Sequence, residues 1–377
     1  MSSVQTTLRP VRGKGELREF LQVPFDLYRG NPHWVPPLWV DRWAFFDRAK
    51  NPFYRTSEVE LWVARRGGKA VGRIAACVNQ DYIRTHGTPT GSFGFFECPN
   101  DSGLARELLD TACAWLRERG MKDALGPFNF STNHEIGMLA DAFDQPPVLM
   151  MTYNPPYYLD LLEQSGWTRA KDVYAFKLSG QIPPPERVRR ISDKVRERSR
   201  VSIRTLDPKR FDREIDLVRE VYNQAWSKNW GFVPLSEEEF RHAAKDMKLI
   251  LRPDWALIAE VDGRAIGFSL TLPNVYESQI KLRNGRLLPT GLFRLLWDLK
   301  VRRPKTARVI TMGVIHDFQK RGVESIFYLE TWDRAHAAGI EWGELSWVLE
   351  DNDMMVKAAQ ALGAERYKTY RVYGRVL

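Results

Sequence analysis

The sequence has few cysteines, and it lacks the long apolar run that a membrane-spanning helix needs. Its three cysteines are an odd number without the spacing of a metal site, which is more typical of a reducing cytoplasm than of secretion. Residues 1–20 lack the apolar core of a signal peptide, and no stretch of about 18 apolar residues occurs. We therefore expect a cytoplasmic protein without a bound metal.

Acidic residues are outnumbered by basic ones, 47 to 56, which gives a net charge of +9 and a pI near 9.4. This excess favours a polyanionic partner, such as a phosphorylated cofactor, an anionic membrane or a nucleic acid. Helix-turn-helix and zinc-finger signatures are absent from the sequence, so we expect no sequence-specific nucleic-acid partner. At 377 residues, the chain is long enough for two or three domains.

Two stretches of the chain are alike enough to indicate an internal duplication. The segment GGKAVGRIAACVN at 67–79 matches DGRAIGFSLTLPN at 262–274. The glycines that correspond are Gly72 with Gly267, Gly103 with Gly322, Gly120 with Gly339 and Gly166 with Gly363, and the spacing between the halves changes only where one half has an insertion. A register that is held across separate glycines predicts two repeats of one fold.

The stretch RVITMGVIHDFQKRGVES, at 308–325, predicts an apolar strand, a short basic loop and the first turn of a helix. Backbone N–H groups at the start of a helix bind phosphate well. Lys320 and Arg321 add two cations to this turn, next to Gly322. The pattern therefore indicates a phosphate site, although a plain turn between strand and helix has the same spacing.

A run of prolines followed by a basic segment marks the boundary between two predicted domains. Three prolines at 183–185 are followed by a basic helix with a narrow apolar stripe, which is typical of a linker on the surface. We predict a first domain at 1–180, a linker helix at 181–204 and a second domain at 205–377. Each repeat also has an insertion: GPFNFSTNHEIG lies in the first, and a short apolar helix with basic flanks, 289–301, lies in the second.

Each half is predicted to run helix, loop, helix, antiparallel hairpin, strand, glycine turn, long helix, strand, helix, strand. This order, with Gln319-x-x-Gly322-x-Glu324 as the loop, resembles the GNAT acyltransferase superfamily, once per half. The resemblance implies an α/β (α+β) fold of two tandem GNAT-like domains, each a mixed, mostly antiparallel sheet flanked by helices. It also implies that the loop amides hold the pyrophosphate of an acyl-coenzyme A, and that an amine attacks the thioester directly.

Charge separates the two loops. The first-half loop, 100–105, has Glu97 and Asp101 beside it, which repel a pyrophosphate, whereas Lys320 and Arg321 attract one. We therefore assign acyl-coenzyme A to the second half and expect the first half to be degenerate. The resemblance implies a cofactor site formed by Val314, Ile315, Gln319, Lys320, Arg321, Gly322, Val323, Ser325 and Asn352.

The sequence departs from the family where it usually has a tyrosine that protonates the leaving thiolate. Ala359 stands at this place in the second half and Leu162 in the first. A general base near neutral pH requires histidine or a carboxylate of raised pKa. The candidates are His316, Glu135 and His134, each of which could instead have a purely structural role. Asn133, Tyr222, Trp230 and Phe232 are the candidates for acceptor binding, with buried aromatic packing as the alternative.

The leading function is transfer of an acyl group from acyl-coenzyme A to an amine. Some bacterial members of the superfamily acylate long-chain amino alcohols to make ceramide-like lipids, and the apolar insertion favours such a lipid-like acceptor. Residues 289–305 are a candidate contact with the inner face of the membrane, unless this helix packs on its own domain. The alternatives are a tandem transferase that uses aminoacyl-tRNA and a non-catalytic module that binds acyl-coenzyme A.

Overall fold

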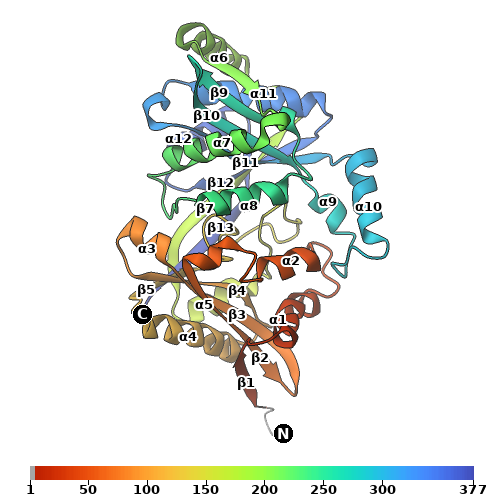
Figure 1. Cartoon of the computed structure of the whole chain (residues 1–377). Helices are drawn as coiled ribbons and strands as arrows, with labels where there is room; N and C mark the ends of the chain where they lie inside the picture. Colours follow the sequence, from red (N-terminus) through yellow and green to blue (C-terminus); the bar gives the residue numbers. More distant parts are fainter. Residues whose placement is uncertain (1–4) are drawn as a thin grey trace. The chain divides into compact units, whose positions relative to one another are not determined.

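The computed structural model describes residues 5–377, which form two compact units (Figure 1). Unit 1 contains residues up to Val173 together with Gln279–Phe293 and Lys368–Leu377, and unit 2 contains Tyr174–Ser278 and Arg294–Tyr367. The predicted division at 1–180, 181–204 and 205–377 stays a prediction about how the sequence repeats. The compact units differ from it because each takes in segments from distant parts of the chain.

Unit 1 is a sheet with helices on both faces. Its elements are β1 (Thr6–Pro10), α1 (Lys14–Leu27), α2 (Trp39–Phe45), η1 (Pro52–Arg55), β2 (Ser57–Arg66), β3 (Lys69–Asn79), α3 (Gln80–His86), β4 (Thr90–Glu97), α4 (Ser102–Glu118), β5 (Asp123–Gly126), β6 (Met138–Leu139) and α5 (Tyr157–Gln164). Two longer strands, β7 (Thr168–Ser179) and β13 (Glu365–Val376), belong to it in part. The strand order is β1-β2-β3-β4-β5-β13-β7, and β6 pairs with β13.

Alternating side chains of the unit 1 strands supply two cores. Ile74 and Ala76 of β3 pack with α4 and α5, whereas Ala75 and Cys77 of the same strand pack with α1. This alternation follows from the two-residue repeat of a strand, and it buries both faces of the sheet. The pair β4–β5 is parallel, and the pairs β1–β2, β2–β3 and β3–β4 are antiparallel.

Unit 2 repeats this plan. Its elements are α6 (Glu186–Ser199), β8 (Ser202–Thr205), η2 (Pro208–Arg210), α7 (Phe211–Ala225), α8 (Glu237–Met247), η3 (Pro253–Trp255), β9 (Ala256–Val261), β10 (Arg264–Pro273), η4 (Asp298–Arg302), β11 (Thr306–Val314), η5 (His316–Phe318), α11 (Val323–Ala337), β12 (Trp342–Leu349) and α12 (Asp353–Ala361). Two short helices, α9 (Tyr276–Gln279) and α10 (Gly291–Trp297), belong to it in part. The strand order is β7-β12-β11-β10-β9-β8, with β11–β12 as its parallel pair. A core between α7, α11 and strands β9 and β10 holds the unit together.

The glycines that the sequence pairs between the two halves can be compared in the structure. Gly120 and Gly339 have φ of +78° and +77°, which a residue with a side chain rarely adopts, and each follows the long helix of its unit. The loop glycines are not equivalent in position: Gly322 is the N-cap of α11, whereas Gly103 already lies inside α4 and Asp101 is the cap. The two phosphate-type loops therefore differ in backbone position as well as in charge.

The predicted linker helix and the predicted apolar helix both form. The linker is α6, which belongs to unit 2, where Val188 packs with Leu329 of α11 and Leu362. The apolar helix is α10, continued by the short η4. Within residues 5–377, no helix is both long and apolar enough to cross a membrane.

Candidate active site

The parallel strands β11 and β12 of unit 2 separate partway along their length. Their register runs from Thr306 opposite Trp342 to Val309 opposite Leu345 and ends there. Strand β11 continues to Val314 and β12 to Leu349, and the register of β10 with β11 shifts at the same level. Past this point the facing edges of the two strands no longer pair with each other. We call this arrangement the unit 2 fork.

The helix α11 begins at the open end of the fork. Its N-cap is Gly322, with φ of +83°, which has no side chain that could cap the first amides of the helix. A Cβ on Gly322 would lie 2.8 Å from a methyl group of Val195, so glycine is required here for room as well as for conformation. Lys320 and Arg321 are exposed just before it. The turn therefore combines helix amides with two cations, as an anion site does.

The predicted residues before this turn are brought together. The Nε2 of Gln319 donates to the carbonyl oxygen of Val314 at 2.9 Å, and its Oε1 lies 3.2 Å from Nδ1 of His316. The Nε2 of His316 lies 3.0 Å from Oγ of Ser227. Val314 and Ile315 are buried beneath the turn. This network fixes the path of the chain from β11 into the loop.

The remaining predicted cofactor residues lie at helix starts. Val323 is buried, and Oγ of Ser325 donates to the carbonyl oxygen of Gly322 at 2.6 Å. Asn352 caps α12, with its Oδ1 accepting from the amide of Met355 at 3.2 Å. Burial raises the pKa of Glu324, and a hydrogen bond with its own backbone amide opposes this rise.

A buried charged cluster occupies the closed end of the fork. Arg308 of β11 and Glu344 of β12 are 1% and 0% exposed, with Nε and Oε1 3.8 Å apart. Ser346 accepts from Nε of Arg308 at 2.9 Å and donates to Glu344, which also accepts from the hydroxyl of Tyr367. The Arg308 guanidinium lies over the ring of Trp347 at 4.8 Å. Buried charges of this kind need such partners, and they often belong to functional sites.

Sequence reasoning missed this cluster. The available signal was a charged residue near the start of each of two apolar strands, Arg308 in RVITMGV and Glu344 in ELSWVL. The pairing of β11 with β12 brings these two positions opposite each other. Tyr367 comes from β13 and carries no comparable signal in the sequence.

A narrow apolar cavity of about 50 Å³ adjoins the last paired residues of the fork. Val309 and Leu345 line it, and Trp332 of α11 faces them. The hydroxyl of Thr271, also in its wall, is buried without a hydrogen-bond partner in the described structure. The cavity therefore lies between the fork and the helix α11.

The predicted acceptor residues of unit 2 lie on the α7 side. Tyr222 stacks on Trp226 at 4.9 Å and lies 5.9 Å from the ring of Phe232, and burial raises the pKa of Tyr222. The Trp226 ring lies so close to Gly313 of β11 that a Cβ there would be 2.3 Å from it. Trp230 is half-buried in the loop between Tyr222 and Phe232. This aromatic group thus lies against the C-terminal end of β11.

In unit 1 the corresponding strands do not open. The amide of Phe128 donates to the carbonyl oxygen of Phe93 at 2.8 Å, and Oδ1 of Asn129 accepts from the amide of Phe95 at 2.6 Å. A Cβ on Gly94 would lie 1.8 Å from the Phe128 carbonyl oxygen. The segment after β5 therefore fills the space between β4 and β5.

The anion position of unit 1 is also occupied. The carboxylate of Asp101 accepts from the amide of Leu104 at 3.0 Å and pairs with Arg66 at 2.8 Å. The Leu104 amide, more than the Arg66 guanidinium, lowers the pKa of Asp101, so the carboxylate stays charged. It stands where a phosphate oxygen would bind to a helix start.

The polar residues predicted in the first half form a network in unit 1. Burial alone would raise the pKa of Glu135, but Arg42 at 2.8 Å and the Asn129 amide at 2.8 Å lower it. The ring of His134 lies 5.4 Å from each of two phenylalanine rings, and its Nδ1 contacts Ser131. The amide of Asn133 donates to Ser131 at 3.2 Å. These residues belong to unit 1 and His316 to unit 2.

Unit 1 has a second, largely buried carboxylate, Glu97, at the end of β4. The hydroxyls of Tyr28 and Tyr158 both donate to its Oε2 at 2.8 Å, and Arg73 lies 3.3 Å from Oε1. Burial raises the pKa of Glu97 despite these partners. Sequence comparison placed Leu162 at the family's tyrosine position, whereas the structure brings Tyr158 of α5 to β4.

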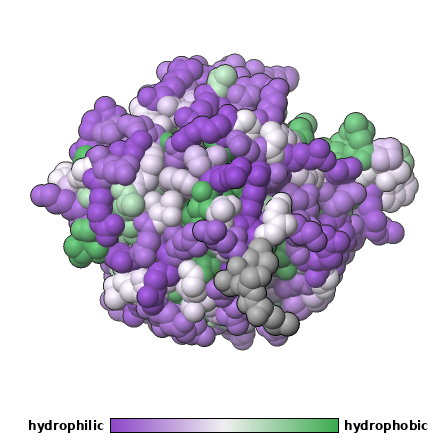
Figure 2. Space-filling model, turned by 90° about the horizontal axis from the view of Figure 1, so that it is seen from below, coloured by the Kyte–Doolittle hydropathy of each residue, from purple (hydrophilic) through white to green (hydrophobic). Residues whose placement is uncertain are grey.

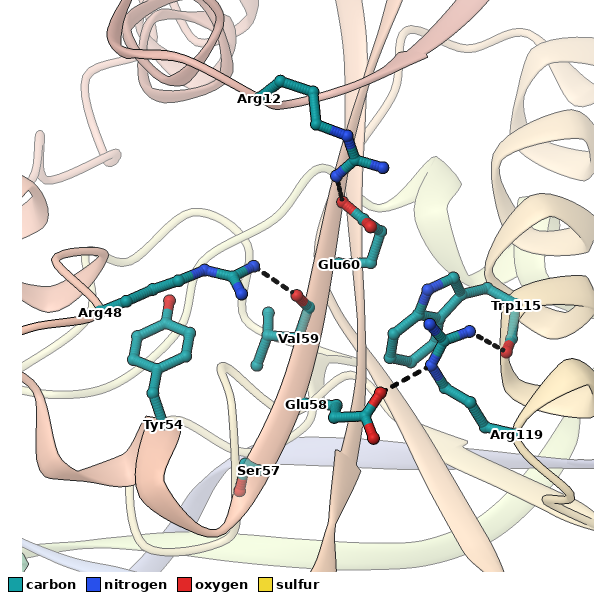
Figure 3. Close-up of a pocket in the computed structure, with 9 residues that line it drawn as sticks. All are labelled: Arg12, Arg48, Tyr54, Ser57, Glu58, Val59, Glu60, Trp115 and Arg119. Atoms are coloured by element: carbon teal, nitrogen blue, oxygen red, sulfur yellow. Dashed lines mark hydrogen bonds and ion pairs between the residues drawn. The ribbon is translucent and has the colours of Figure 1, made fainter.

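A polar hollow of about 420 Å³ lies along β2 of unit 1 (Figure 3). Arg12, Arg48 and Arg119 point into it from three different segments. Arg12 pairs with Glu60 at 2.6 Å and Arg119 with Glu58 at 2.9 Å. The positive charge of these arginines in the hollow is therefore largely neutralised by carboxylates that also line it. Among residues 5–377, no group of His, Cys, Asp and Glu side chains has the arrangement of a metal site.

Known proteins resemble this chain over its whole length. It is 39% identical to the bacterial ceramide synthase of Caulobacter vibrioides, over 98% of this chain and 97% of that protein. It is 35% identical to protein YghO of Escherichia coli, over 99% and 96%. No family model matches the sequence.

Solved structures resemble the fold. A tandem GNAT protein from the clavulanic acid biosynthesis pathway superposes with a TM-score of 0.58 at 14% identity, covering 99% of this chain and 98% of that one. A GCN5-related N-acetyltransferase from Sphaerobacter thermophilus gives a TM-score of 0.54 at 14% identity, covering 98% and 95%. The expected fold, tandem GNAT-like and mostly antiparallel, is confirmed.

Proposed function

Because the chain belongs to the GNAT acyltransferases, in the family of the bacterial ceramide synthase of Caulobacter vibrioides, we propose that it transfers an acyl group from acyl-coenzyme A to the amine of a long-chain amino alcohol. Acyl transfer on a GNAT fold follows from the comparisons. What we propose beyond this is the identity of the acyl donor and of the amine acceptor. It is supported above all by the unit 2 fork, which opens past Val309 and Leu345 toward the uncapped start of α11.

The residues of unit 2 suit an acyl-coenzyme A. The free backbone of β11 and β12 would hold the pantetheine arm, and the α11 amides with Lys320 and Arg321 would hold the pyrophosphate. The thioester then lies toward the closed end of the fork. The apolar cavity beside Val309 and Leu345 would receive the first carbons of the acyl chain.

In the reaction, the amine nitrogen bonds to the thioester carbon, the C–S bond breaks, and the proton that the amine loses ends on the sulfur. The proposed proton acceptor is Glu344, since it lies at the closed end of the fork and accepts from Tyr367 and Ser346. His316 follows the other end of β11, eight positions after Arg308, the partner of Glu344, which corresponds to roughly 25 Å along an extended chain. Its contact with Gln319 favours a role in holding the loop, and a role as base remains a prediction.

The test of the proposal is thiol release from acyl-coenzyme A with long-chain amino alcohols as acceptors. Replacing both loop cations, Lys320→Glu with Arg321→Glu, should raise KM for acyl-coenzyme A about tenfold, because two charge-assisted contacts are lost. The matched control is Arg106→Glu, an exposed arginine near the start of α4 in unit 1, which should leave KM unchanged.

Other outcomes would identify the alternatives. An unchanged KM in the loop variant would show that the pyrophosphate binds elsewhere. Calorimetric binding of acyl-coenzyme A without thiol release, for every amine offered, would support a non-catalytic module. Consumption of aminoacyl-tRNA in place of acyl-coenzyme A would support the tRNA-dependent transferase.

A further inference from the structure

Large hydrophobic side chains are exposed mainly in one segment of the chain. Of the twelve that are more than about two-fifths exposed within residues 5–377, six lie between positions 288 and 301. These six are between 43% and 76% exposed: Leu288, Leu292, Phe293, Leu296, Trp297 and Val301. Figure 2 shows a largely hydrophilic surface on which hydrophobic residues come out at several places, one of them the upper right, the side on which α10 lies in Figure 1.

The helix α10 is apolar on its outer face. Leu292 and Leu296 are one helical turn apart, and Phe293 and Trp297 form the adjacent row, so these four share one face. Gly291, just before them, is buried on the inner side. A helix on the surface of a water-soluble protein normally has polar residues outward. The outer face of α10 therefore fits an apolar environment.

The segment around this face is strongly basic. Positions 281–305 hold eight lysines and arginines, all exposed, and a single acidic residue, Asp298. Asp298 is buried, and Arg302 lies 3.7 Å from it, so it adds little negative charge to the surface. Positive charge thus surrounds the apolar face.

We propose that residues 286–305 dock on an anionic lipid bilayer. The outer side chains of α10 enter the boundary between headgroups and acyl chains, and Arg286, Arg294, Lys300 and Arg303 lie against the lipid phosphates. The basic rim favours a membrane over an apolar protein partner, because anionic headgroups complement it along the whole segment. Docking also brings the protein to the phase in which a long-chain amine dissolves, although this surface is independent of the proposed reaction.

The experiment is flotation of the full chain with vesicles of phosphatidylcholine, with and without phosphatidylglycerol. The wild type should float with the anionic vesicles and lose binding in high salt, since the charge contacts are exposed. Leu292→Asp with Leu296→Asp should abolish flotation. Lys300→Glu with Arg303→Glu should reduce it at least severalfold while leaving the apolar face intact.

The matched control is Ile182→Asp with Leu249→Asp, two exposed hydrophobic residues outside the segment, which should float as the wild type does. Equal melting temperatures exclude misfolding as the cause of a loss. The proposal is overturned if the wild type fails to float, or if the α10 variant floats equally. It is also overturned if the wild type is a dimer that the α10 variant dissociates, without vesicle binding. Thiol release from a short-chain acyl-coenzyme A without vesicles tests the reaction separately.

Discussion

The two units have the same pair of parallel strands, but one pair opens and the other is closed. In unit 2, β11 and β12 separate after four paired positions and the helix that follows begins with an uncapped glycine turn. In unit 1, Phe128 and Asn129 bond to β4, and Asp101 caps the next helix. The backbone groups of β4 that would face a ligand in unit 1 are thus satisfied within the unit itself.

Each unit also has one buried carboxylate on these strands, and exchanging both for amides gives the sharpest comparison. Glu344→Gln should lower kcat by about a hundredfold or more, because an amide cannot accept the proton. Glu97→Gln in unit 1 should leave kcat within about twofold. Both variants are measured by thiol release at saturating acyl-coenzyme A, with melting temperature as the check on folding.

The Glu97 variant adds a test of pH dependence. Burial raises the folded-state pKa of Glu97 above its unfolded value, so the folded state binds this proton more tightly. The stability that this proton contributes is fully present at a pH below the pKa of Glu97 in the unfolded state. It is lost as the pH rises through the pKa of Glu97 in the folded state. The stability of the wild type relative to Glu97→Gln should therefore fall over that window. A constant difference across pH would contradict the assignment.

The cavity offers a more selective comparison. Val309→Phe places a ring where we expect the first acyl carbons, so kcat/KM for long-chain acyl-coenzyme A should fall about tenfold relative to acetyl-coenzyme A. Val63→Phe, in the core of unit 1, is the matched change of the same residue type. It should cost stability without altering the chain-length ratio. If Val309→Phe lowers kcat/KM equally for long-chain acyl-coenzyme A and for acetyl-coenzyme A, the acyl chain does not bind in this cavity.

The smallest effect concerns the occupied anion position of unit 1. Asp101→Ala removes the cap of α4 and should lower the free energy of unfolding by about 1 kcal/mol. Turnover should not change, and calorimetry should detect no additional binding of coenzyme A, since the neighbouring strands stay closed. A new binding event in this variant would show that the cap alone excludes the ligand.

The sequence predicted the parts of this arrangement that depend on local chemistry. The turn at Gly322, its two cations and the repeated glycines are visible because each needs a particular residue at one position. The Arg308–Glu344–Tyr367 cluster was missed because its members lie far apart in the chain and meet through strand pairing. The closure of unit 1 was also missed, since it depends on backbone bonds from Phe128 that any residue could make.

The strand β13 has a consequence for how the protein is made. Its residues from Lys368 onward pair with β5 and β6, so the sheet of unit 1 is completed by a segment synthesised after all of unit 2. Unit 1 leaves the ribosome first, and the edge of its strand β5 stays unpaired until translation is nearly finished. Neither half of the duplicated sequence, cut at residue 180 or 204, would carry a whole sheet.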